Sequence, residues 1–493
     1  MQRVSEGGSA CTRLALRAQP DNWLRRVFAG AAAAEAADLQ RALQHVSSHT
    51  ALVELPSGVR KGIAAWLSGP SAPAGRSIRQ LRAESGRLLS ALRARSRGFP
   101  AAPLPPTPVS RSASAVMTPH ALSRLLSNVE SGRNDVVAAP RYTDSEVSQY
   151  AATRLPCTFA SLHRVFAELA TLRPGARPAS LLDWGAGPGT AALAAASVWP
   201  NALHTVVHVE QSGAMLSLAD TLRSAWEGNE APPPPTVHSS VLRLRGPAFH
   251  RSFDLVVASY ALGEASEAEQ AGLLRRLWAH TRSFLIIIEP GTPKGSAIVR
   301  AARRRVLGIA AKAGRGAGVE SERKLLDTAS VVAPCPHDGP CPMDADPLSW
   351  CHFTVRVHRP REARLAKGGA SRPAGSFQDE RFSYVVLQRG ERAGDHTLRL
   401  GGDAALGAAY ADDRDVDAPS PEALAHAVRN AASGWGRLVR PPRPRARHVV
   451  LDLCARSGQL ERRIVAPSHD ARLMPGAYRQ ARKARWGDTW PWN

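Results

Sequence analysis

Residues 181–190 read LLDWGAGPGT, and this stretch decides the fold. An apolar run leads into three glycines at alternate positions, and the alanine-rich segment that follows is typical of a helix. Gly185, Gly187 and Gly189 permit a tight turn and let the backbone approach a ligand without clashes from side chains. Their spacing differs from the G-x-G-x-x-G of dinucleotide sites and from the G-x-x-x-x-G-K-S/T of P-loops. A nucleoside that carries no pyrophosphate therefore suits this turn better.

Short β-type runs and helix-compatible segments alternate on both sides of the turn. This alternation predicts an α/β protein with a doubly wound parallel sheet. Beyond residue 289 the pattern loosens into a basic helix at residues 297–309, with later strand candidates. The predicted strands are Ser180–Trp184, His204–Val209, Val237–Leu244, Phe253–Ser259, Phe284–Glu289, Phe382–Gln388 and His448–Leu453.

Two acidic residues lie at the ends of the first two predicted strands. Asp183 can reach the amino-acid portion of a ligand, and Glu210, 27 residues further on, can accept hydrogen bonds from both hydroxyls of a ribose. With these residues the segment resembles the class I S-adenosylmethionine-dependent methyltransferases. The resemblance implies S-adenosylmethionine as a cofactor, held by Asp183, Gly185, Gly187, Gly189 and Glu210.

The acceptor side of this resemblance is incomplete. Residues 258–261 lack the Asn/Asp-Pro-Pro-aromatic clamp with which amino-group methyltransferases hold a target nitrogen, and no cysteine nucleophile lies beside them. The third strand candidate, Ser240–Arg243, lacks the acidic residue that often pairs with adenine. The sequence therefore supports the cofactor cleft better than the reaction, and the catalytic residues stay unassigned. A transferred methyl would go to a base near Ser259 and Tyr260.

Three cysteines lie in a proline-rich segment that cannot build an apolar core. Cys335, Cys341 and Cys351 fall within 17 residues, so metal coordination is a means of ordering this loop. The fourth ligand is a local histidine, His337 or His352, or the distant Cys454. Four thiolates suit zinc or an iron–sulfur cluster, and a mixture of cysteine and histidine favours zinc.

The charge balance predicts a polyanionic partner. The 493 residues include 64 basic and 42 acidic ones, which gives a formal net charge of +22. Three basic segments can contact RNA phosphates: Arg300 to Arg305, Arg440 to Arg447, and Arg479 to Trp486. The six cysteines are too few and too unevenly spaced for a disulfide scaffold. No apolar run reaches the roughly 18 to 20 residues that span a bilayer, so no membrane partner is expected.

The order of the motifs is more specific than any one of them. From Tyr150 and Arg154-Leu-Pro156, through LLDWGAGPGT, IIIEPGTPKG, CPHDGPCP and WCHF, to the segments around Trp435 and Cys454, the chain resembles the methyltransferase-like proteins of the mitochondrial small ribosomal subunit. The similarity covers roughly residues 140–490. It implies an assembly factor of the mitochondrial matrix whose partners are small-subunit rRNA, ribosomal proteins and other assembly factors. It also implies a [4Fe-4S] cluster with Cys335, Cys341, Cys351 and Cys454 as ligands, with zinc as the alternative.

Two other functions stay open at this point: an active S-adenosylmethionine-dependent rRNA methyltransferase, and a zinc-stabilised interaction module. The expected architecture is a class I methyltransferase-like sheet with an N-terminal helical region and a Cys-rich metal-binding insertion. The basic N-terminus, residues 1–30, suits a mitochondrial presequence or an ordinary basic helix. The further predicted segments are a helical region at 31–99, a Pro-rich linker at 100–118, a helical lead-in at 119–172, the methyltransferase-like core at 173–333, the Cys-rich cluster-binding insertion at 334–360, and C-terminal strands with a basic RNA-binding tail at 361–493.

Overall fold

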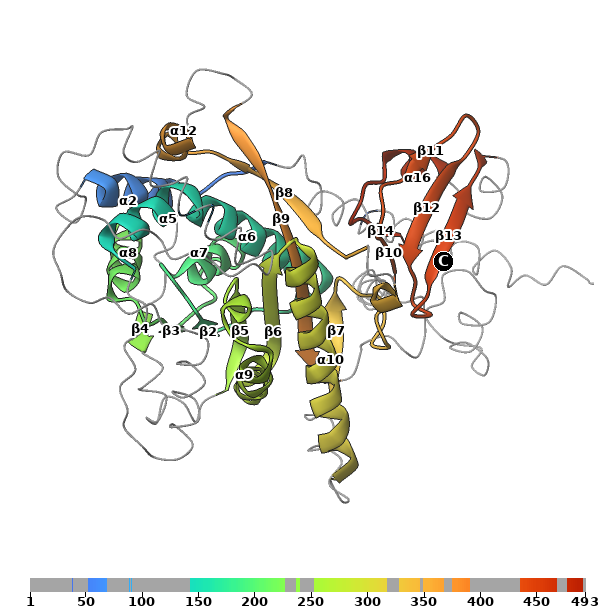
Figure 1. The fold of residues 1–493 in the computed structure, drawn as a ribbon, viewed down its shortest axis with the longest axis horizontal. Helices are drawn as coiled ribbons and strands as arrows, with labels where there is room; N and C mark the ends of the chain where they lie inside the picture. Colours follow the sequence, from blue (N-terminus) through green and yellow to red (C-terminus); the bar gives the residue numbers. More distant parts are fainter. Residues whose placement is uncertain are drawn as a thin grey trace, which may run out of the picture.

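The computed structural model describes two β-sheets and the helices that cover them (Figure 1). The predicted presequence, the Pro-rich linker and the segment Ser240–Arg243 lie outside the described residues. The residues described are 52–68, 142–226, 236–239, 252–316, 328–345, 349–367, 375–390, 435–467 and 477–490, together with the single positions 38, 88 and 90.

The larger sheet is doubly wound, as the sequence predicts. Its order is β1-β8-β9-β6-β5-β2-β3-β4, and β7 pairs with β9. The strands β2 to β6 run parallel, whereas β9 runs antiparallel to β6, β7 and β8. Their bounds are β1 Leu52–Val53, β2 Ser180–Trp184, β3 Thr205–Val209, β4 Thr236–Ser239, β5 Phe253–Ser259, β6 Thr281–Pro290, β7 Ala329–Ala333, β8 Phe353–His358 and β9 Phe377–Arg389.

Two layers of helices bury the two faces of this sheet. Because successive strand residues point to opposite faces, Leu181 and Leu255 pack on one side and Leu182 and Val256 on the other. The first layer contains α2 Ser57–Ser68, α5 Asp144–Thr153, α6 Leu155–Leu172, α7 Thr190–Val198 and α8 Gly213–Ser224. The second contains α9 Glu267–Ala279 and α10 Pro293–Gly316. α12 spans Arg361–Lys367.

The main sheet extends past the core limit predicted at residue 333. Both β8 and β9 join it, and β8 lies inside the segment predicted as the Cys-rich insertion. The cysteine loop proper is therefore the connection between β7 and β8, with a short 3-10 helix at Pro342–Ala345.

A second, antiparallel sheet stands beside the main one at the C-terminal end (Figure 1). It has the order β11-β12-β10-β14, and β13 pairs with β12. Leu451, Leu453 and Trp490 form a separate small core with α16, Ala477–Lys483. The strands are β10 Gly436–Leu438, β11 Arg443–Pro444, β12 Val449–Cys454, β13 Leu460–Val465 and β14 Thr489–Trp490.

Candidate functional site

The glycine turn lies where the strand order reverses, between β2 and its neighbours β3 and β5. The N–H groups of Gly185 and Ala186 donate to the carbonyl of Val209, which fixes the turn against the end of β3. Gly187 and Gly189 both have positive φ, at +53° and +74°. A Cβ at Gly189 would lie 2.5 Å from the ring of His208, whereas a Cβ at Gly187 would meet nothing within 4 Å. Gly187 therefore borders open space that a ligand can fill.

Asp183, the residue before the last one of β2, has a buried carboxyl group with spare hydrogen-bonding capacity. Its side chain is 2% exposed, and within the described part of the chain its Oδ2 has no partner. Burial and the nearby charge of Glu210 raise the pKa of Asp183 to about 7, although the N–H of Ala191 donates to it. A buried acceptor without a partner is unusual, and a ligand that donates a hydrogen bond here would satisfy it.

Glu210 is placed at the end of β3 as predicted, but its carboxylate already binds the chain. Oε2 accepts from the N–H of Gly187 at 2.8 Å, and Oε1 accepts from the N–H groups of Gln211 and Ser212 at 2.9 and 2.8 Å. A carboxylate offers about four acceptor positions, so roughly one is left. To bind both hydroxyls of a ribose, Glu210 must release Gly187.

The region after β5 holds an interacting cluster that sequence reasoning did not anticipate. Tyr260, with φ of +57°, donates to Ser161 Oγ at 3.2 Å and to Glu380 Oε1 at 3.4 Å. The guanidinium of Arg154 packs over the Tyr260 ring at 5.2 Å and pairs with Glu380 at 3.1 Å. The aromatic face that would stack on a target base is therefore covered by a side chain of α6's N-cap. No sequence signal pointed to Glu380, because it lies on β9, 226 residues from Arg154.

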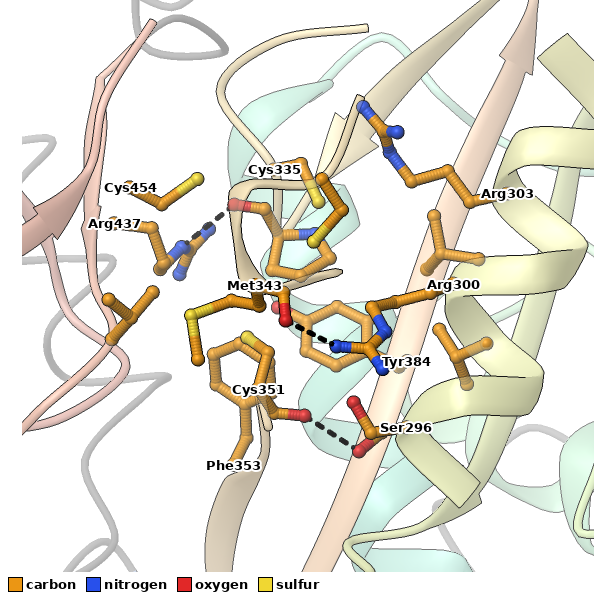
Figure 2. A pocket seen from close by; sticks show the side chains of 16 residues that line it. Ser296, Arg300, Arg303, Cys335, Met343, Cys351, Phe353, Tyr384, Arg437 and Cys454 are labelled. Atoms are coloured by element: carbon orange, nitrogen blue, oxygen red, sulfur yellow. Dashed lines mark hydrogen bonds between the residues drawn. The ribbon is translucent and has the colours of Figure 1, made fainter. Parts of the chain in front are cut away.

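All four predicted cluster ligands line one cavity. Cys335 and Cys341 come from the loop after β7, Cys351 from the residues before β8, and Cys454 from the end of β12 (Figure 2). The cavity has a volume of about 40 Å³, well above the ~10–15 Å³ that one water molecule needs. The structure thus brings the distant Cys454 to the three local cysteines.

Three of the four thiols that line this cavity have raised pKa values. Burial, followed by the neighbouring sulfurs, raises the pKa of Cys341 to about 11 and raises those of Cys351 and Cys454 still further. Three arginines line the same cavity, namely Arg300, Arg303 and Arg437 (Figure 2). Cysteine binds metal groups as the negatively charged thiolate. The three nearby guanidinium groups would stabilise thiolates in this cavity, which suits it to such a group.

The geometry of a single metal ion is not formed. Among the residues that the structure describes, no group of three or more His, Cys, Asp or Glu side chains is placed to hold a metal ion. Of the two candidate histidines, His337 lies against Cys454, with Nε2 3.4 Å from Sγ. His352 instead packs its ring 4.1 Å from that of Trp486.

The basic helix predicted at residues 297–309 is part of α10, but not all of its arginines are exposed. Arg303 is 4% exposed and donates to the carbonyl of His337 at 2.7 Å, while Arg300 donates to the carbonyl of Met343 at 3.1 Å. Both guanidinium groups therefore bind carbonyls of the cysteine loop, and the buried Arg303 is not available to phosphates in solvent. Arg304, with 69% of its side chain exposed, is the outward member.

The other two basic segments lie on the C-terminal sheet and α16. Arg445 and Arg447 are exposed, as are Arg482 and Lys483. Trp486 is half-buried and makes a T-shaped contact with the ring of His352. None of the helices described by the structure is both long and apolar enough to cross a bilayer.

Sequence comparison matches residues 144–491 to the family model described as mitochondrial small ribosomal subunit Rsm22. The human mitochondrial ribosome assembly protein METTL17 is 29% identical over 353 residues, which cover 71% of this chain and 63% of that protein. The Rsm22-cox11 tandem protein 2 of Schizosaccharomyces pombe is 31% identical, covering 71% of this chain and 43% of that one. The ribosome assembly protein RSM22 of Saccharomyces cerevisiae is 26% identical, with 42% and 38% covered. The chain spans less than two thirds of the length of each of these relatives.

Solved structures similar to this chain include methyltransferases. Magnesium protoporphyrin IX methyltransferase from Synechocystis, solved with bound S-adenosylhomocysteine, is 13% identical with a TM-score of 0.27, covering 55% of this chain and 94% of that one. The small RNA methyltransferase HEN1 is 15% identical with a TM-score of 0.28, covering 47% and 25%. These scores are low, and the fold assignment rests on the strand order.

The predicted class I methyltransferase-like fold and the predicted family resemblance are confirmed. The mitochondrial location is confirmed as well, because the human and yeast relatives are all named as mitochondrial proteins.

Proposed function

The chain belongs to the mitochondrial small ribosomal subunit Rsm22 family, and on that premise we propose that it is an assembly factor for the small subunit of mitochondrial ribosomes. The family match carries the proposal, because it spans both the main sheet and the C-terminal sheet. The human and Saccharomyces relatives are named ribosome assembly proteins. The partners of this chain are then small-subunit rRNA, ribosomal proteins and other assembly factors in the matrix.

Binding of rRNA falls to the exposed arginines of the C-terminal sheet and α16. Arg445, Arg447 and Arg482 are free of the buried contacts that occupy Arg303. Guanidinium groups on an exposed surface neutralise phosphates and displace condensed counterions. Affinity for rRNA should therefore fall steeply as salt rises.

The glycine turn supports S-adenosylmethionine as the ligand of the cleft. The open space at Gly187 and the unpartnered Oδ2 of Asp183 fit a nucleoside-bearing amino acid. Asp183 would accept from its donors, and Glu210 would accept from its ribose hydroxyls after it releases the N–H of Gly187. When bound, S-adenosylmethionine supplies an electrophilic sulfonium methyl. The residues of this chain hold and orient the ligand.

The residues after β5, where a methyl acceptor would bind, favour the role of assembly factor over that of methyltransferase. A target base would have to displace Arg154 from the Tyr260 ring and separate it from Glu380 before it could reach the ligand. No side chain in this cluster is left ready to take a proton from a base. S-adenosylmethionine then stabilises the cleft, and rRNA binds elsewhere on the surface.

An inorganic centre fits the four-cysteine cavity, and we assign its ligands to Cys335, Cys341, Cys351 and Cys454. Four thiolates suit either zinc or an iron–sulfur cluster, and the family resemblance favours the [4Fe-4S] cluster. Three arginines at the wall offset its negative charge.

One experiment separates assembly from catalysis. The variant Gly187→Asn keeps a residue that tolerates positive φ but places a side chain in the open space of the cleft. We expect calorimetry to show that the variant no longer binds S-adenosylmethionine. Filter-binding assays should show that its affinity for a small-subunit rRNA transcript is unchanged. Neither the wild type nor the variant should methylate a base of that transcript. Gly175→Asn, on an open turn away from the cleft, is the control. A methylated base made by the wild type and absent with Gly187→Asn would establish the enzyme instead.

A further inference from the structure

Arg437 is buried where the two sheets meet, and its guanidinium contacts three separate parts of the chain. Its side chain is only 4% exposed. Nη2 pairs with Glu168 Oε1 on α6 at 2.6 Å. Nε donates to the carbonyl of Pro334 at 3.1 Å, and Nη1 donates to the carbonyl of Gly487 at 2.9 Å. One planar guanidinium thus joins β10 to the main core, to the cysteine loop and to the C-terminal segment.

Arg437 is linked to two of the cluster-ligand candidates, once through a side-chain contact and once through strand pairing. Pro334 immediately precedes Cys335 in the sequence. On the other side, Arg437 is the register partner of Cys454 in the β10–β12 ladder. Figure 2 shows Arg437 between the C-terminal sheet, which carries Cys454, and the loop that carries Cys335.

The partner of Arg437 is itself held firmly. Glu168 is 1% exposed, and its second oxygen accepts from the hydroxyl of Tyr384 at 2.6 Å. Arg164 lies 3.8 Å from the same oxygen. Burial alone would raise the pKa of Glu168, but the charges of Arg437 and Arg164 outweigh it and hold that pKa below its ordinary value. The carboxylate is therefore a fixed anchor in the main core.

We propose that Arg437 is a positioning residue that sets the distance between Cys454 and the three loop cysteines. Without its contacts, the small sheet that carries Cys454 would keep only contacts such as that of Cys454 with His337 and the packing of Trp486 on His352 to hold it against the loop. The proposed metal centre would give this positioning a function, and only that part of the inference rests on the proposed function. The convergence of the thiols is a property of the protein chain alone.

Arginine is required because the three acceptors lie in different directions around one plane. Lysine could keep the charge opposite Glu168, but a single ammonium on a flexible stem cannot also donate to the carbonyls of Pro334 and Gly487 in a fixed fork. Arg437→Lys therefore removes the positioning contacts and retains the ion pair. Glu168→Gln removes the ion pair and retains a group of the same size.

The test uses the full chain without metal, with Cys11 and Cys157 replaced by alanine. Dibromobimane links two thiols that lie close together, and mass spectrometry of the digested protein identifies which cysteines are joined. In the parent protein we expect links from Cys454 to the loop cysteines. In Arg437→Lys and in Glu168→Gln these links should fall about fivefold or more, because the fork or its anchor is lost. Links within the loop, such as Cys335 to Cys341, should persist.

The matched control is Arg443→Lys on neighbouring β11. Arg443 pairs with Asp452 inside the C-terminal sheet and is 44% exposed, so its loss should leave the Cys454 links unchanged. Circular dichroism shows whether each variant folds. If Arg437→Lys does not fold, the milder variant Glu168→Gln still tests the proposal. Unchanged Cys454 links in both folded variants would overturn the positioning role.

Metal analysis of the same variants, purified without oxygen, separates this inference from the proposed centre. Loss of both the Cys454 links and the bound metal in Arg437→Lys supports the two together. Loss of the links in a protein that never holds metal supports the positioning role and contradicts the proposed centre. Metal lost while the links stay contradicts the positioning role.

Discussion

At the scale of single residues, two glycines of the same turn have different reasons to be glycine. Both need positive φ, which costs an alanine about 1–2 kcal/mol. Only at Gly189 would a Cβ also press on the His208 ring, which overpacking data put at about 1–3 kcal/mol more. We expect urea unfolding to show that Gly189→Ala is destabilised more than Gly187→Ala by about this second amount. Equal losses would mean that His208 moves aside without cost.

Glu289 predicts a pH dependence of stability. Burial raises its pKa to about 8, although the N–H groups of Leu262 and Gly263 donate to it. Because the folded form holds the proton more tightly than the unfolded form, the stabilisation is complete below about pH 4.5, the ordinary value, and is lost as the pH rises towards 8. The buried carboxyl group therefore lowers the free energy of unfolding by up to about 1.4 kcal/mol per pH unit within that window.

The substitution Glu289→Gln isolates this contribution. The amide oxygen can still accept from Leu262 and Gly263, but it does not titrate. Between about pH 5.5 and 7 the variant should lose stability less steeply than the wild type, while Asp183, whose pKa is also raised, to about 7, keeps part of the slope in both. Parallel curves in urea titrations at several pH values would show that Glu289 is not protonated in the folded protein.

At the scale of helices and strands, α10 divides its arginines between structure and surface. Arg303→Ala leaves the carbonyl of His337 without its charged donor, and loss of such a hydrogen bond costs about 1.5–3 kcal/mol. Arg304→Ala, on the exposed side, should change stability by less than about 0.5 kcal/mol. Thermal unfolding of the two variants checks this, and similar melting temperatures would place Arg303 outside the structural network.

The same helix shows how far sequence patterns reach. β2 and β5 match their predicted bounds because continuous apolar runs between turn signals define buried parallel strands. The run of arginines in α10 identified a basic helix, but not which of its sides faces the cysteine loop. Arg300 and Arg303 donate hydrogen bonds to carbonyls of that loop. Only the tertiary structure shows which side of the helix faces the loop.

Contacts between distant elements were the least predictable part of the site. Glu168 and Arg437 are 269 residues apart, and neither lies in a pattern that predicts an ion pair. The glycine turn, Asp183 and Glu210 were found because their chemistry is local to strand ends. Cys454 was placed with the other cysteines only through family resemblance, since spacing alone left His337 and His352 as equal candidates.

At the scale of the whole molecule, a net charge of +22 attracts RNA over long distances, but only arginines that touch phosphates set the salt dependence. Arg445 and Arg447 are exposed on the C-terminal sheet. Replacing both with alanine should weaken binding to a small-subunit rRNA transcript and reduce the log–log salt slope by about 1.4, or about 0.7 for each lost phosphate contact.

A second pair of arginines controls for overall charge. Arg275 is exposed on α9, and Arg282 is 58% exposed at the start of β6. The double alanine variant at these positions also removes two positive charges, but from α9 and the start of β6 in the main sheet. If rRNA binds through the C-terminal sheet, this variant should lower the association rate slightly and leave the slope unchanged, because long-range attraction alone depends on total charge. The same drop in slope for both pairs would show that rRNA contacts the molecule without a preferred face.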